Sequence, residues 1–113
     1  MTTWPGATHP ADTTVVAKRT RLKPGMEHAY EAAHRHPPAE VTVALRTAGV
    51  TQWRIWRSGL DLFHVIDVVD RGRMRRVLTE DPTMVAWGAR MRELLEPLPA
   101  PESDDFELVW TLD

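Results

Sequence analysis

Apolar and polar residues recur along the chain with two different periods, and the change of period divides it into predicted elements. Strands are favoured where β-branched and aromatic residues cluster, and helices where apolar residues recur every three or four positions. Glycine and proline separate these segments. The pattern predicts strands over residues 14–22, 50–57, 60–69 and 106–112, and helices over residues 26–36, 38–49, 71–79 and 82–96.

Turn and capping residues indicate where the helices begin and end. Pro37-Pro38 interrupts the first helical stretch, because proline lacks an N–H group and clashes with the preceding turn. Gly49 is a candidate glycine for the end of the second helical piece. Asp81 is a candidate N-cap, with Pro82 at the first helical position.

The predicted elements follow the order β-α-α-β-β-α-α-β. This is the ferredoxin-like βαββαβ arrangement of the α+β class, with each crossover helix broken in two. A length of 113 residues fits one domain, which we assign to residues 14–113. Residues 1–13 contain Pro5, Gly6 and Pro10 and show no periodicity, so we expect them to form a flexible arm.

Residues 60–69 form the clearest predicted strand, and their apolar side chains point to both faces. Leu62 and Ile66 share one face, whereas Phe63 and Val65 share the other. A strand that is apolar on both faces is expected to be covered on both sides. Helices can cover one face, and in a chain this short we expect a second subunit to cover the other. The sequence therefore predicts a homodimer.

The amino-acid composition argues against several classes of partner and of chemistry. Apolar residues make up 42% of the chain and charged residues 27%, which is ordinary for a soluble globular protein. The net charge of −2 gives no electrostatic reason to expect nucleic acid or an anionic membrane as a partner. The lack of cysteine excludes disulfides and thiolate chemistry. Because no signal peptide and no apolar run of ~20 residues is present, we expect a cytoplasmic protein.

The candidate acid–base groups are a tyrosine and two histidines. Tyr30 and His34 are four residues apart on a predicted helix and share one face. A phenol beside an imidazole can exchange protons near neutral pH, although a surface pair without function has the same spacing. His64 lies on an apolar strand, either as a hydrogen-bonded core histidine or as a second proton-transfer group. The spacing of the five histidines does not predict a metal site.

Three tryptophans are candidates to line a small-molecule site. Trp87 belongs to a helical stripe with Met84 and Met91, and such a stripe can form core or line a pocket. Trp53 and Trp56 lie on opposite faces of their predicted strand, so at most one of them faces a given cavity.

The order of short motifs along the chain resembles the L-rhamnose mutarotase family of small dimeric sugar epimerases. The resemblance covers roughly residues 15–113. It rests on Arg21-Leu22-Lys23-Pro24, Tyr30, His34, Glu40, Ala48-Gly49-Val50, Gln52-Trp53-Arg54-Ile55, Leu62-Phe63, Asp81-Pro82, Trp87 and residues 106–112.

The resemblance implies a fold, an assembly and an activity. The domain would dimerise through its sheet into a closed α/β barrel. The activity would be mutarotation of a deoxyhexose such as L-rhamnose or L-fucose, with no cofactor and no metal. One group takes the proton of the anomeric hydroxyl while another protonates the ring oxygen. His34 and Tyr30 would carry these transfers. The candidates to contact the sugar are Trp87, His64 and whichever of Trp53 and Trp56 faces the cavity.

The sequence departs from the family pattern at three places. The tryptophan before a Pro-Glu pair falls at Pro38, the second tryptophan of a Trp-Trp pair falls at Gly88, and an Asn-Tyr pair becomes Gln52-Trp53. The loss of two large rings would leave room for a larger ligand. Three alternatives therefore stay open: an aromatic polyketide cyclase, a cofactor-free monooxygenase, and a dimeric binding domain without catalysis.

Overall fold

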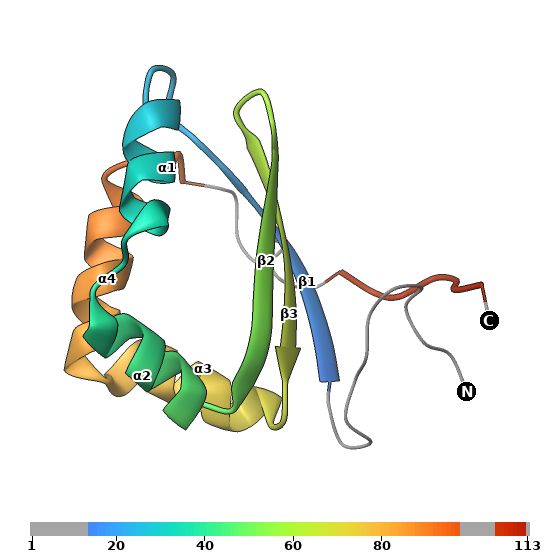
Figure 1. Cartoon of the computed structure of the whole chain (residues 1–113). Helices are drawn as coiled ribbons and strands as arrows, with labels where there is room; N and C mark the ends of the chain where they lie inside the picture. Colours follow the sequence, from blue (N-terminus) through green and yellow to red (C-terminus); the bar gives the residue numbers. More distant parts are fainter. Residues whose placement is uncertain (1–13, 98–105, 113) are drawn as a thin grey trace.

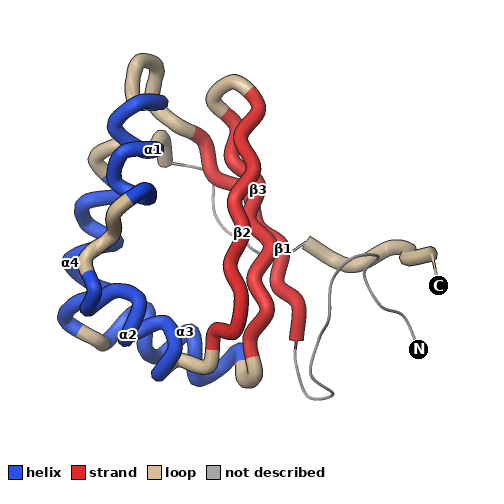
Figure 2. The backbone as a smooth tube through the Cα atoms, viewed as in Figure 1, coloured by secondary structure: helices blue, strands red, loops and turns tan. Residues whose placement is uncertain are grey.

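The computed structural model describes residues 14–97 and 106–112. In this part of the chain, a three-stranded antiparallel sheet is covered on one face by four helices (Figures 1 and 2). The α+β class is thereby confirmed, while the predicted arm over residues 1–13 lies outside the described residues. The elements are β1 (Thr14–Arg21), α1 (Glu27–Arg35), α2 (Ala39–Thr47), β2 (Val50–Ser58), β3 (Asp61–Val68), α3 (Arg71–Glu80) and α4 (Pro82–Arg92).

The central strand of the sheet is β3, which pairs antiparallel with β1 on one side and β2 on the other. His64 of β3 pairs with Lys18 of β1 and with Ile55 of β2. Because side chains alternate along a strand, Leu62, His64 and Ile66 share the face that the helices cover. All three are at most 5% exposed.

Local signals place the helix ends as the sequence predicts. The Asp81 carboxylate accepts hydrogen bonds from the backbone N–H groups of Thr83 and Met84, at 2.9 and 3.2 Å, and Pro82 is the first residue of α4. Gly49 follows α2 with a φ of 87°, a conformation that favours glycine. These residues mark where α4 begins and where α2 ends.

The apolar core divides on either side of His64. Leu62 belongs to a cluster with residues of α1 and α4, whereas Ile66 belongs to a separate cluster with residues of α3 and the end of α2. A third cluster joins α2 to α4 within the helical layer. His64 therefore lies on β3 between the two apolar clusters and belongs to neither of them.

The predicted fourth strand is not formed in this chain, and that prediction is wrong for the described structure. Residues 106–112 have no regular secondary structure, and they lie on the side of the sheet opposite the helices (Figure 1). Phe106, Leu108, Trp110 and Leu112 are all at least 49% exposed. Their alternation favours a strand locally, but a strand also needs a paired neighbour and a surface to cover its apolar face. In the described structure, residues 106–112 pair with neither edge strand of the sheet, β1 or β2.

Within the described residues, no helix has both the length and the apolar character that a membrane span requires.

Candidate active site

A cavity of about 390 Å³ lies between the helical layer and the sheet. Its volume falls in the range of roughly 300–1,000 Å³ that is common for small-molecule sites. Most of its wall is apolar, with a few polar side chains. It is lined by Lys18, Thr20, Tyr30, His34, Pro37, Val41, Thr42, Leu45, Trp53, Ile55, His64, Leu78, Met84, Trp87, Gly88, Met91, Arg92 and Leu95.

His34 enters the cavity from the last turn of α1, where the Pro37-Pro38 break ends the helix. Its Nδ1 lies 2.8 Å from the backbone carbonyl oxygen of Tyr30. A carbonyl only accepts, so Nδ1–H donates and the neutral ring has its lone pair on Nε2. No group in the described residues bonds Nε2. His34 therefore has an oriented imidazole whose basic nitrogen is unoccupied.

Tyr30 lies one turn earlier on the same face of α1, as its spacing from His34 predicts. The two ring centroids are 4.1 Å apart, and Tyr30 is only 5% exposed. Burial raises the pKa of the Tyr30 phenol to about 12, because it disfavours the phenolate. Tyr30 is therefore a neutral hydrogen-bond donor near neutral pH.

The structure brings two of the three candidate tryptophans to the cavity. Trp87 of α4 approaches His34 edge-on, with ring centroids 5.4 Å apart, and Trp53 of β2 lines the opposite wall. Trp56 is not brought to the cavity. It is 51% exposed on the other face of the sheet, because it lies three positions after Trp53 on a strand whose side chains alternate between the two faces.

His64 lines the cavity from β3, but its environment does not suit proton transfer. Its Nε2 lies 2.9 Å from Thr20 Oγ1, and its Nδ1 lies 3.1 Å from the indole nitrogen of Trp53. Burial, with smaller electrostatic contributions from Lys18 and His34, lowers the pKa of His64 to about 3. Of the two roles open to it in the sequence, the structure favours the hydrogen-bonded histidine.

Several cavity residues were not identified from the sequence. Thr20 and Lys18 come from β1, and Arg92 comes from the end of α4. Each looks like an ordinary surface residue in the sequence, and only the pairing of β1 with β3 and the position of α4 bring them together.

Gly88 also lines the cavity, and a Cβ atom there would lie 3.4 Å from Nη1 of Arg92. The guanidinium of Arg92 therefore lies beside Gly88, the position at which the family pattern has its second tryptophan.

The charged groups at the cavity are all basic. The lining residues include Lys18 and Arg92 but no aspartate or glutamate, and the guanidinium of Arg90 lies 5.4 Å from the centroid of the Trp87 ring. Within the described ranges, no three histidine, aspartate or glutamate residues are grouped as metal ligands would be.

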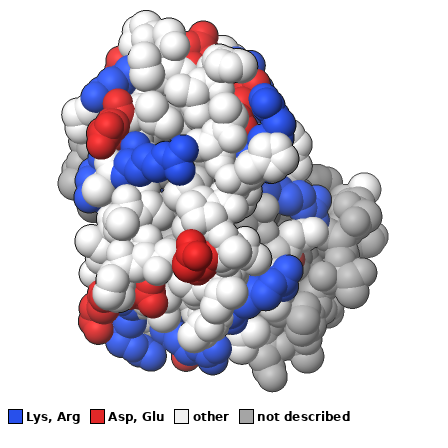
Figure 3. Space-filling view, turned by 60° about the vertical axis from the view of Figure 1, so that its left-hand side comes forward, with Lys and Arg blue, Asp and Glu red and all other residues white. Residues whose placement is uncertain are grey.

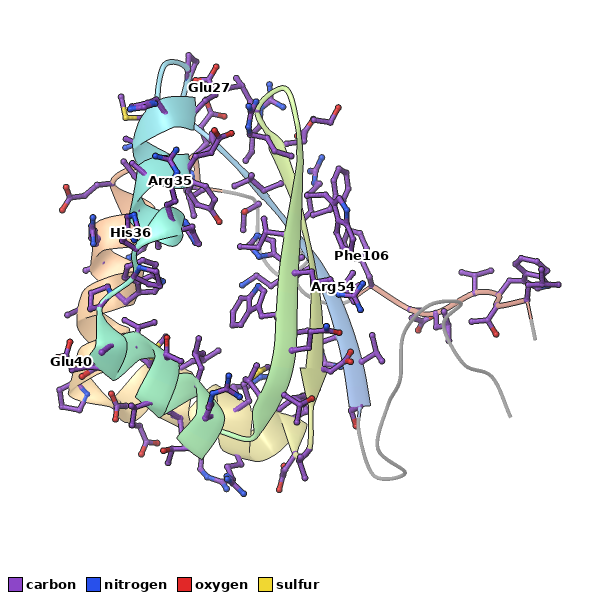
Figure 4. All side chains as sticks on the ribbon, viewed as in Figure 1. Glu27, Arg35, His36, Glu40, Arg54 and Phe106 are labelled. Carbon is purple, nitrogen blue, oxygen red and sulfur yellow. The ribbon has the colours of Figure 1, made fainter. Side chains whose placement is uncertain are left out.

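His36 and Glu40 lie on the side of the helices away from the sheet (Figure 4). On the surface view, both charge signs are scattered among neutral residues (Figure 3).

The fold is similar to several solved structures. L-rhamnose mutarotase from Formosa agariphila has a TM-score of 0.72 at 21% sequence identity, with 88% of this chain and 99% of that chain covered. Tetracenomycin F2 cyclase from Streptomyces glaucescens, a type II polyketide cyclase, has a TM-score of 0.60 at 21% identity over 88% and 99% of the two chains. A conserved protein from Methanosarcina mazei Go1 has a TM-score of 0.59 at 12% identity over 76% and 84%. At these identities the likeness shows the fold alone.

The sequence itself identifies the family. No curated protein matches the chain with significant similarity. The sequence profile of the L-rhamnose mutarotases, however, matches residues 15–112, a range that contains every residue lining the cavity. The chain therefore belongs to the L-rhamnose mutarotase family, a family of carbohydrate-acting isomerases.

Proposed function

We propose that this protein interconverts the α and β anomers of a deoxyhexose of the L-rhamnose or L-fucose type by general acid–base ring opening. The observation that carries the proposal is the His34 imidazole at the cavity, with Nδ1 held by a backbone carbonyl and Nε2 unoccupied. Family membership supports a sugar as the substrate.

The chemistry requires one proton to move between two oxygens on the same carbon. Nε2 of His34 takes the proton of the anomeric hydroxyl, and the bond between C1 and the ring oxygen breaks. The ring oxygen receives a proton from the imidazolium, which leaves an open-chain aldehyde and a neutral histidine. The carbonyl group rotates, and closure on its other face reverses the transfers. Because both oxygens are bonded to C1, one well-placed imidazole reaches both.

The other cavity residues position the sugar in this scheme. Tyr30 stays protonated, so it donates a hydrogen bond to a sugar oxygen and does not act as the base. Trp87 and Trp53 offer flat apolar surfaces on opposite walls for the ring and the methyl group of a deoxyhexose. We also propose that the protein works as a homodimer in the cytoplasm, and the dimer is tested below.

The test is anomer exchange measured by saturation-transfer NMR on L-rhamnose and L-fucose, without a coupling enzyme. We expect the wild type to exceed the buffer-catalysed rate. His34→Ala should lower the catalysed rate by roughly 10²- to 10⁴-fold, which is the contribution of one general acid–base group. His28→Ala, at an exposed position on the same helix, is the matched control and should keep the wild-type rate.

Two results would contradict the proposal in different ways. A wild type that accelerates exchange of neither sugar, nor of a panel of other deoxyhexoses, overturns mutarotation. A wild type that is active while His34→Ala is unaffected overturns the role of His34 alone.

The apolar character of the cavity favours a second candidate, ring closure on an aromatic polyketide-like substrate. Eleven of the lining residues are aliphatic or aromatic (proline, valine, leucine, isoleucine, methionine, tyrosine and tryptophan), and Gly88 adds space where the family has a tryptophan. A polycyclic phenol would then quench the fluorescence of Trp53 and Trp87 at micromolar concentration, whereas L-rhamnose would not compete with it. Competition by the sugar would favour the mutarotase.

A further inference from the structure

A chain of two hydrogen bonds crosses the sheet and ends at the cavity wall. It runs from Trp53 on β2 through His64 on β3 to Thr20 on β1. The three side chains share the face of the sheet that the helices cover, as diagonal neighbours on adjacent strands. All three line the cavity.

The direction of both hydrogen bonds follows from the donor chemistry of the groups. An indole N–H only donates, so Nδ1 of His64 accepts from Trp53 at 3.1 Å. A neutral imidazole then has its proton on Nε2, and this N–H donates to Thr20 Oγ1 at 2.9 Å. The reverse tautomer would set two N–H groups against each other between Trp53 and His64.

The same geometry keeps His64 neutral. A second ring proton on Nδ1 would meet the indole N–H of Trp53, and burial of the ring at 5% exposure opposes the charge as well. The lowered pKa of His64 agrees with this arrangement. The direction of the hydrogen-bond chain is therefore fixed near neutral pH.

The hydroxyl of Thr20 is the free end of the chain. Its oxygen already accepts from His64, so its own proton has to be donated elsewhere. Within the described residues, no other hydrogen bond to Thr20 Oγ1 is formed. The side chain lines the cavity, so a ligand oxygen is the acceptor that this arrangement suits.

We propose that Thr20 is a substrate-binding residue that donates a hydrogen bond to an acceptor oxygen of the sugar, and that His64 and Trp53 are positioning residues that make it a donor. The proposal rests on the proposed function for the identity of the ligand. The hydrogen-bond chain itself exists without ligand. Together with Tyr30, Thr20 gives the cavity two neutral donors, whereas Nε2 of His34 is its acceptor.

The first experiment tests the hydrogen-bond chain without any substrate. Long-range ¹H–¹⁵N NMR spectra of the imidazole groups report which nitrogen of a histidine is protonated. For His64 we expect the Nε2–H tautomer at pH 7, with no titration down to pH 5. In Trp53→Phe, which removes the indole N–H, we expect the Nδ1–H tautomer or the imidazolium to appear over the same range. A wild-type His64 that is cationic or protonated at Nδ1 at pH 7 overturns the proposal.

The second experiment tests the contact with the sugar. Thr20→Val has nearly the same shape but no hydroxyl, and we expect it to raise KM for anomer exchange roughly three- to tenfold, as for loss of one hydrogen bond, with kcat changed less than KM. Thr20→Ser restores the hydroxyl and should bring KM back toward the wild-type value. Thr79→Val, at an exposed position on α3 away from the cavity, is the control.

The outcomes separate this proposal from the proposed function. An active wild type with unchanged KM in Thr20→Val overturns the role of Thr20 and leaves mutarotation intact. A wild type without exchange activity overturns mutarotation and, with it, the sugar as the acceptor for Thr20. If Thr20→Val fails to fold, Thr20→Ala also removes the hydroxyl and takes its place, and an unchanged KM in Thr20→Ala likewise overturns the role of Thr20.

Discussion

Two histidines face one cavity and differ in what their ring nitrogens can do. His34 has one nitrogen held by a carbonyl oxygen and the other unoccupied. His64 has both nitrogens occupied, by an indole donor and a hydroxyl acceptor. Residue type alone does not distinguish a proton shuttle from a fixed hydrogen-bond group, but the partners of the ring do.

The buried neutral state of His64 has a consequence for stability. Its pKa is about 3 in the folded protein and close to 6.5 when unfolded. Between these values the unfolded chain binds a proton that the folded chain does not, so stability falls as pH drops through this window. We expect His64 to account for about 2 kcal/mol of the stability lost between pH 7 and pH 5.

Urea unfolding of the wild type and of His64→Gln at both pH values measures this contribution. Glutamine does not titrate, so the variant should lose about 2 kcal/mol less between the two pH values than the wild type. The carboxylates titrate in both proteins and cancel in the comparison. Parallel losses in the two proteins would show that His64 is not held neutral by the fold.

At the scale of elements, the predicted helix caps and three of the four predicted strands are confirmed, whereas the fourth strand is not formed in the described residues. Asp81-Pro82 starts α4 and Gly49 follows α2, because capping depends on residues within one turn. The strand predicted for residues 106–112 fails because pairing depends on a neighbour that alternation does not specify.

In the candidate site too, contacts between residues close in the sequence could be predicted, whereas contacts between distant residues could not. Tyr30 and His34 meet because i, i+4 spacing on a helix is local. The contact of Thr20 with His64 spans 44 residues and depends on the register between two strands. No feature of the sequence near Thr20 marks it as part of a site.

Gly88 lies inside α4 at the cavity wall and lowers the intrinsic stability of that helix. A glycine inside a helix costs about 1 kcal/mol relative to alanine. A Cβ atom at Gly88 would approach only the mobile end of Arg92, at 3.4 Å. Gly88→Ala should therefore raise the free energy of unfolding by about 0.5–1 kcal/mol, as measured by urea denaturation.

Gly59→Ala is the matched comparison. A Cβ atom at Gly59 would have no neighbour within 4 Å, but the φ of Gly59 is +61°, so alanine there should lower the free energy of unfolding by about 1 kcal/mol. A destabilised Gly88→Ala would mean that α4 packs more tightly at the cavity than the contacts at Gly88 indicate.

For the whole molecule, the helices cover one face of the sheet and leave apolar side chains on the other. Phe63 is 42% exposed and Trp56 is 51% exposed on that face. Arg54 and Phe106 lie on this side as well (Figure 4), and residues 106–112 extend from it with their apolar side chains uncovered. A monomer that exposed all of these groups would be unusual. A second copy of the chain is the occupant that the family resemblance implies.

We therefore expect the protein to sediment as a homodimer at micromolar concentration, with the two outer sheet faces in contact. Phe63→Arg places a charge in this contact twice, once from each subunit, because a two-fold interface repeats every residue. Sedimentation equilibrium should show that the variant is a monomer, or that its dissociation constant is at least about tenfold higher, because unpaired buried charges are costly. Val43→Arg, at a 64% exposed position on α2, is the control and should remain a dimer. A monomeric wild type would show that the outer sheet face is not covered by a second subunit, and the two-sided apolar pattern of β3 would then need another explanation.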